Sequence, residues 1–213
     1  MKVLFVSNGH GESAIALRLA RELHSLAAER GAHLELDHFP LVGCGDSDEL
    51  LSLVGPRRAM PSGGLVAMAN VVAFAGDLRA GFLPLLGAQL RFLRREGPQY
   101  ALVVAVGDVY ALSLARLCRR PTIFIGTAKS IYVSAYGAAE RTMLRAAARV
   151  FVRDEATAAR LRDEGVAAEA PGNVIADLGD DGGPALDGEW IGLLAGSRRQ
   201  AYDDAVRLAR VAV

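Results

Sequence analysis

Hydrophobic and polar positions along this chain alternate between short apolar runs and longer amphipathic stretches. An unbroken apolar run such as Lys2–Ser7 is typical of a strand that is covered on both faces of a parallel sheet. From Glu12 to about Arg30 the apolar residues instead recur every three or four positions, and Gly31 ends the pattern. The first 31 residues therefore predict a strand followed by its crossover helix.

The same strand and helix unit repeats along the chain. Further strands are predicted at His33–Phe39, Tyr100–Val106, Pro121–Ile125 and Val150–Val152. Helices are predicted up to Glu96 with a break near Pro84, then up to Leu117, over Ala138–Ala148, and from the opening Arg153-Asp154-Glu155 to Gly165. This alternation predicts an α/β fold with a doubly wound, Rossmann-like parallel sheet.

A change in composition predicts a domain boundary near the end of the chain. Asp177–Gly188 is rich in Gly, Asp and Pro and has no periodicity, which is typical of a linker. It separates a first domain of residues 1–176 from residues 189–213. In that last segment we expect one strand, Trp190–Leu194, and one helix, Ala201–Val213, as the start of a second domain.

The most apolar stretch, Leu65–Leu90, is interrupted by Asp77, Arg79 and Pro84. It therefore lacks the run of about 20 apolar residues that a membrane-spanning helix needs. We expect a buried helix pair here, with peripheral contact to a membrane surface as the alternative.

Composition excludes several classes of function. Lys plus Arg and Asp plus Glu each number 24, so no overall field attracts nucleic acid, and any basic site must be local. The two cysteines, Cys44 and Cys118, lie far apart and predict neither a disulfide framework nor a zinc site. The apolar run at the start is too short for a signal peptide. We therefore predict a cytoplasmic protein without a zinc site. We also expect no other metal and no cofactor.

Polar loops follow nearly every predicted strand. They are Asn8–Glu12, Gly107–Asp108, Gly126–Ser130, Arg153–Asp154, Gly172–Asn173 and Gly196–Arg198. Of these, Arg153–Asp154 is expected to be structural. Loops at the carboxyl ends of parallel strands converge, and ligands of such folds bind there. These loops therefore hold the candidate site residues.

The first loop combines two glycines, Gly9 and Gly11, with the start of a helix, whose free N–H groups favour polar or anionic ligands. It matches no nucleotide-binding fingerprint. Asn8 and His10 are candidates here, His10 as a base. The alternative is a tight turn in which the Glu12 carboxylate only interacts favourably with the dipole of the following helix.

Asp108 is the strongest single candidate for a catalytic residue, because it directly follows an apolar strand and Gly107. A carboxylate at that place can accept a proton from a substrate hydroxyl. Asp is also a favoured N-cap, and a helix follows it, so the base and cap interpretations both stand.

Three later loops carry candidates for binding an anion or a sugar. Thr127, Lys129 and Ser130 supply two hydroxyls and a cation beside a turn, and Asn173 adds an amide. Gly196, Ser197 and Arg198 lie at a predicted helix start, where an arginine can bind the oxygens of a departing diphosphate.

These motifs occur together in one order: Ser7-Asn8-Gly9-His10-Gly11-Glu12, Pro40-Leu41-Val42-Gly43, Pro61-Ser62-Gly63-Gly64, Val106-Gly107-Asp108, Gly126-Thr127-Ala128-Lys129-Ser130, Phe151-Val152-Arg153-Asp154 and Gly172-Asn173. The set resembles the family related to lipid A disaccharide synthase, which are metal-independent glycosyltransferases of the two-domain GT-B fold. The resemblance implies an acceptor-binding amino-terminal domain, a nucleotide-sugar donor such as a UDP-linked acylated glucosamine, and a lipid or sugar acceptor. It also implies that Asp108 is the general base, that Glu12 belongs to the reaction centre, and that Ser197 and Arg198 bind the diphosphate.

Two motifs depart from the family pattern. Ser13-Ala14-Ile15 stands where true synthases have Ser-Gly-Asp, and Val109-Tyr110-Ala111 replaces their Pro-Asp-Phe-Asn. The chain also ends one helix after Arg198, so we expect an incomplete donor domain and little activity of these residues alone. The competing hypotheses are an enzyme similar to UDP-N-acetylglucosamine 2-epimerase and a non-catalytic module that binds lipid or a membrane surface.

Overall fold

The computed structural model describes residues 1–45, 48–59, 76, 78–178 and 199–212. The chain divides into two compact units, residues 1–178 and residues 179–213. In the second unit, α7 (Arg199–Ala212) confirms the helix predicted there. The predicted strand Trp190–Leu194 and most of the predicted linker lie outside the described residues.

The first unit is built on a seven-stranded parallel sheet with the strand order β3-β2-β1-β4-β5-β6-β7. Its strands are β1 (Lys2–Ser7), β2 (Glu35–Pro40), β3 (Ser52–Leu53), β4 (Leu102–Gly107), β5 (Thr122–Gly126), β6 (Arg149–Val152) and β7 (Ala168–Glu169). Three of the strands, β1, β2 and β4, are buried except at their first residue. For β1 and β4 this agrees with their apolar sequence, whereas β2 buries two polar residues, Asp37 and His38.

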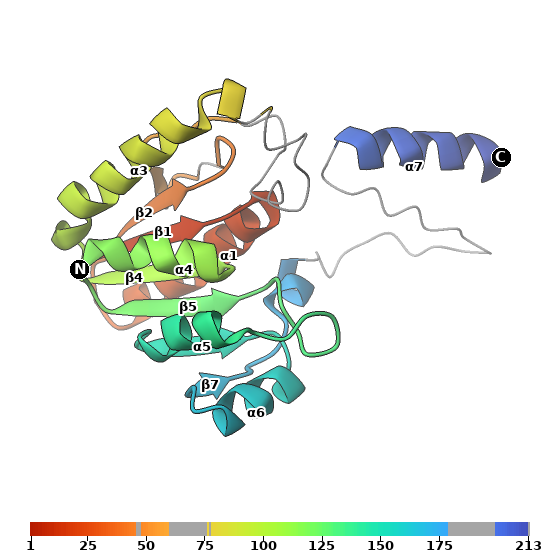
Figure 1. The fold of residues 1–213 in the computed structure, drawn as a ribbon. Coiled ribbons are helices and arrows are strands. Elements are labelled where there is room, and N and C mark those ends of the chain that lie inside the picture. The colour runs from red at the N-terminus through yellow and green to blue at the C-terminus, as the bar shows by residue number, and fades with distance from the viewer. Residues whose placement is uncertain (46–47, 60–75, 77, 179–198, 213) are drawn as a thin grey trace. The chain divides into compact units, whose positions relative to one another are not determined.

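Helices cover both faces of this sheet (Figure 1). On one face lie α1 (His10–Glu29) and the 3-10 helix η4 (Val174–Leu178). On the other lie α3 (Phe82–Glu96), α4 (Val109–Ala115), α5 (Ala138–Arg145) and α6 (Glu155–Asp163), with the 3-10 turns η2 (Gly97–Gln99) and η3 (Arg116–Cys118) beside them. The predicted doubly wound, Rossmann-like α/β fold is therefore confirmed.

Most element boundaries fall within a few residues of the predicted ones. The expected break near Pro84 is the beginning of α3, where proline is tolerated because the first-turn N–H groups have no intrahelical acceptor. The strands β3 and β7 were not predicted, because two residues are too few to form a recognisable pattern.

The direction of the winding reverses between β1 and β4, which are neighbours in the sheet. From β1 the chain passes through α1 on one face to β2, whereas α3, on the other face, leads into β4. At such a switch point the loops after the two strands part and leave a crevice. Here those loops are Asn8–Gly9 and Asp108, which contain candidate site residues predicted from the sequence.

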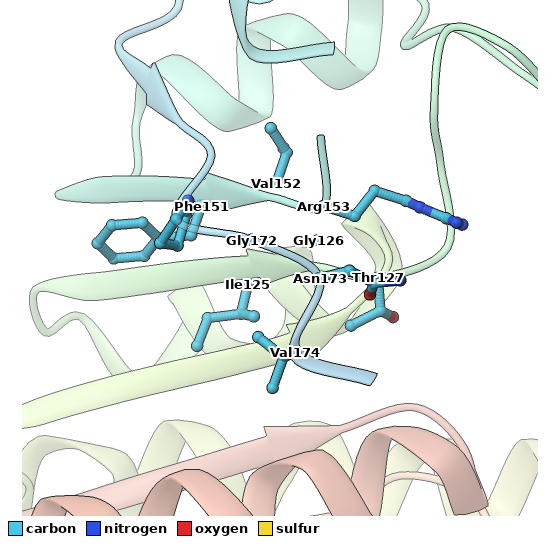
Figure 2. Close-up of a pocket in the computed structure, with 10 residues that line it drawn as sticks. Ile125, Gly126, Thr127, Phe151, Val152, Arg153, Gly172, Asn173 and Val174 are labelled. Atoms are coloured by element: carbon cyan, nitrogen blue, oxygen red, sulfur yellow. The ribbon is translucent and has the colours of Figure 1, made fainter. Parts of the chain in front are cut away.

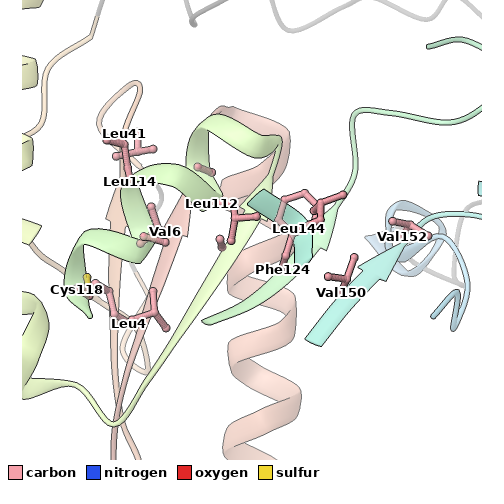
Figure 3. Close-up of a cluster of buried hydrophobic side chains, with 14 of the residues drawn as sticks. Leu4, Val6, Leu41, Leu112, Leu114, Cys118, Phe124, Leu144, Val150 and Val152 are labelled. Carbon is pink, nitrogen blue, oxygen red and sulfur yellow. The ribbon is translucent and has the colours of Figure 1, made fainter. Parts of the chain in front are cut away.

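The core forms two layers, one on each face of the sheet. The larger layer packs strand residues such as Leu4, Val6 and Phe124 against α4 and α5 (Figure 3). Cys118 belongs to this layer, and burial raises the pKa of its thiol to about 12, so the thiol stays protonated and unreactive. The smaller layer packs Val3, Phe5 and Val104 against α1.

Candidate functional site

One hydrogen bond joins the two loops at the switch point. The Asn8 side-chain amide, after β1, donates from Nδ2 to Oδ2 of Asp108, after β4, over 2.9 Å. The two residues are 100 positions apart in the sequence, and both side chains are partly buried. The structure thus brings the first-loop and fourth-strand candidates together, as the converging loops predict.

Asp108 is the N-cap of α4. Its Oδ1 accepts hydrogen bonds from the backbone N–H groups of Tyr110 (3.0 Å) and Ala111 (3.1 Å). The cap interpretation is therefore confirmed. Each carboxylate oxygen already accepts at least one hydrogen bond, so the group is held in one orientation.

Glu12 lies in the first turn of α1, and two glycines make room for its side chain. A Cβ atom on Gly9 would lie 2.4 Å from Glu12 Oε2, and one on Gly107 would lie 3.0 Å from Glu12 Cγ. Gly107 also has a φ of 126°, which side chains rarely allow. The glycines of the two motifs thus let the Glu12 side chain fold across the crevice toward β4.

A third loop reaches the same carboxylate. Thr127, after β5, donates from Oγ1 to Glu12 Oε1 over 3.4 Å, and its backbone N–H donates to the Gly107 carbonyl over 3.1 Å. Among the described residues no donor bonds to Glu12 Oε2. Glu12 therefore has one carboxylate oxygen available to a ligand.

The other first-loop candidates lie apart from this contact. His10 is exposed, and its ring lies against Gly43 on the β2 side of β1, whereas Asp108 lies on the β4 side. Gly11 is exposed with open space around it.

Lys129 and Ser130 are engaged within the protein. Lys129 Nζ donates to Glu140 Oε2 over 2.7 Å and lies 5.6 Å from the centre of the Tyr136 ring. Ser130 is buried, and its hydroxyl accepts from the backbone of Tyr132. In this conformation Lys129 is half of an ion pair, and a ligand anion would have to compete with Glu140.

A small hollow lies over the ends of β5 and β6 (Figure 2). Thr127, Arg153 and the loop Gly172–Asn173 line it. Asn173 Oδ1 accepts from the Ile175 N–H over 3.3 Å, so its side chain also stabilises the turn into η4. Arg153 lies 4.0 Å from Asp154, a loose ion pair in accord with the structural role expected of both residues.

Asp154 caps α6, as Asp108 caps α4. Partial burial acts to raise the pKa of its carboxyl group, but hydrogen bonds from Thr157 and Ser130 outweigh burial and lower it. The carboxylate is therefore ionised and fixed at the helix start.

Two tyrosines near Asp108 were not predicted from the sequence. The hydroxyl groups of Tyr110 and Tyr136 are buried and have no hydrogen-bond partner among the described residues. Burial, reinforced by Asp108, raises the pKa of Tyr110 to about 12, and burial with the carboxylates of Glu140, Asp108 and Asp154 raises the pKa of Tyr136 further. Both remain neutral hydroxyls, and no sequence pattern distinguishes them from ordinary core tyrosines.

The remaining candidates, Gly196, Ser197 and Arg198, lie outside the described residues. Within the described ranges no group of His, Cys, Asp and Glu could hold a metal ion. The helices that the structure describes are all too short or too polar to cross a bilayer.

Comparison with known proteins adds no family assignment. No protein-family model matches the chain, and a search of curated proteins finds no significant match.

Proposed function

We propose that this chain is the acceptor-binding part of a GT-B glycosyltransferase, in which Glu12 accepts the proton of the acceptor hydroxyl. The observation that carries the proposal is the Glu12 carboxylate, held at the switch point of a doubly wound sheet with one oxygen available. The motif resemblance supports the reaction class. It named Asp108 as the base, but the hydrogen bonds to both Asp108 oxygens favour Glu12.

The proposed reaction is a single inverting displacement. The acceptor oxygen forms a bond to the anomeric carbon of the donor sugar while the bond from that carbon to the diphosphate oxygen breaks. The hydroxyl proton passes to Glu12, and the nucleoside diphosphate leaves with the bonding electron pair. Asp108 orients Asn8 and the start of α4, and Ser197 and Arg198 are the proposed partners of the leaving diphosphate.

The direct test is release of UDP from a UDP-linked hexosamine by the protein produced from its complete gene. We expect release only when a glucosamine-containing lipid or sugar acceptor is added, because the hydroxyl is the attacking group. Conversion of the UDP-sugar without acceptor would instead establish the epimerase hypothesis. No conversion under either condition contradicts both.

A second candidate function, binding to a membrane surface, is favoured by the outer face of α3. Leu83 in its first turn is 61% exposed, and Arg91, Arg94 and Arg95 on its last turns are all exposed. Exposed apolar and basic side chains on one helix suit an anionic lipid surface.

Replacing the three α3 arginines with glutamine is expected to weaken binding to phosphatidylglycerol vesicles about 100-fold, since each basic residue near an anionic surface contributes about 1 kcal/mol. Co-sedimentation measures this, with phosphatidylcholine vesicles as the uncharged reference. The matched control replaces three exposed arginines elsewhere, Arg18, Arg30 and Arg149. Equal losses in both triple variants, or no binding by the unaltered protein, would exclude a surface on α3.

A further inference from the structure

A buried polar network lies beneath the first loop. The Ser7 hydroxyl is 3.0 Å from the Ser13 hydroxyl and 2.8 Å from Nε2 of His38. The relative exposures of the three residues are 0%, 1% and 0%. Buried hydroxyl and imidazole groups are costly unless they are hydrogen-bonded, so these contacts stabilise one arrangement strongly.

The network connects the two residues that flank the first loop. Ser7 is the last residue of β1 and directly precedes Asn8, and Ser13 directly follows Glu12. Their hydroxyl contact therefore ties together the two ends of the segment that carries the candidate site residues. His38 belongs to β2, and its backbone pairs in register with Phe5, so the closed loop is also anchored to the neighbouring strand.

Among the described residues, no side chain caps the start of α1 directly. Its N-cap is Gly9, which makes no side-chain capping bond, and the backbone at that end is held by the bond from the Ser13 N–H to the Gly9 carbonyl, 2.9 Å. Asp108 and Asp154, by contrast, cap their helices directly. The hydroxyl of Ser13 acts from inside the helix and restrains the turn that holds Glu12.

We propose that Ser7, Ser13 and His38 are positioning residues that fix the first loop, and with it the Glu12 side chain, against Thr127 and Gly107. This inference rests on the proposed function for its catalytic consequence, but the restraint on the loop is independent of it. A catalytic group displaced by about 1 Å can lose about 100-fold in rate, which is why such a restraint matters.

The test is Ser13→Ala in the protein from the complete gene. The variant removes the contact between the loop ends and leaves the Ser7 to His38 bond intact. We expect the amide of residue 13 to exchange its hydrogen about tenfold faster, as the loss of one buried hydrogen bond predicts. We also expect kcat for glycosyl transfer to fall about 10-fold to 100-fold with KM within about twofold, since positioning, not acceptor affinity, is lost.

A matched control and a second variant keep the result decisive. Thr122→Val is the matched control, because it removes a buried hydroxyl that donates to the Arg120 carbonyl at the start of β5, away from the first loop. It should change neither the exchange rate at residue 13 nor kcat. If Ser13→Ala does not fold, Ser13→Cys keeps a side chain of the same shape, slightly larger, with a weaker hydrogen-bonding group. It should change the exchange rate and kcat less, in the same direction.

The two readouts separate this inference from the proposed function. Faster exchange in a protein that transfers no sugar supports the loop restraint and rejects the transferase. Unchanged exchange at residue 13 overturns the restraint, whatever the activity. Faster exchange with unchanged kcat in an active enzyme overturns the positioning role.

Discussion

Glu12→Gln is expected to lower kcat for acceptor-dependent UDP release by about 10²–10⁴-fold, the usual contribution of a positioned general base. Glutamine keeps the volume of the side chain and an oxygen that can accept from Thr127, so the fold and the loop contact survive. It has no basic oxygen, so the acceptor hydroxyl must lose its proton to water. KM should change little, because the lost interaction belongs to the transition state.

The measurement is steady-state kinetics with a UDP-linked donor and a glucosamine-containing acceptor. Glu22→Gln is the matched control, since Glu22 lies on the same helix in an exposed pair with Arg18, and it should leave kcat unchanged. Turnover of Glu12→Gln within about threefold of the unaltered enzyme would remove Glu12 from the reaction.

Asp108→Ala is expected to destabilise the fold by about 1 kcal/mol and to lower kcat by about 100-fold. The stability loss follows from the two backbone N–H groups of α4 that lose their cap. The rate loss follows from the release of Asn8 and the surrounding loops, which moves the reacting groups out of alignment. Urea denaturation and the same kinetic assay measure the two effects.

Asp108→Asn separates positioning from proton acceptance. Asparagine keeps an oxygen for the α4 cap. The Asn8 amide can turn so that its Oδ1, which has no partner among the described residues, accepts from the new side-chain N–H. We therefore expect nearly unchanged stability and a loss of only about tenfold in kcat. A loss as large as that of Glu12→Gln would assign the proton acceptor to Asp108, as the motif resemblance implies.

Several site residues could be predicted from the sequence because strand, loop and helix signals are local. Asp108 directly follows a buried strand, and its position before a helix predicts the cap that the structure confirms. Convergence of Asn8, Asp108 and Thr127 follows from the parallel arrangement of β1, β4 and β5. His10 has the same local context, yet its side chain lies toward β2, because the side-chain direction depends on neighbours far away in the sequence.

By itself the sequence determined the α/β class, the strands β1, β2, β4, β5 and β6, and the loops where polar groups gather, because burial periodicity and turn chemistry act over a few residues. Only the tertiary structure decided which of those polar groups meet. The space that Gly9 and Gly107 leave for Glu12, the pairing of Lys129 with Glu140, and the contact of Ser7 with His38 are side-chain contacts. They depend on strand order and on how helices pack across the sheet, and no local pattern encodes either.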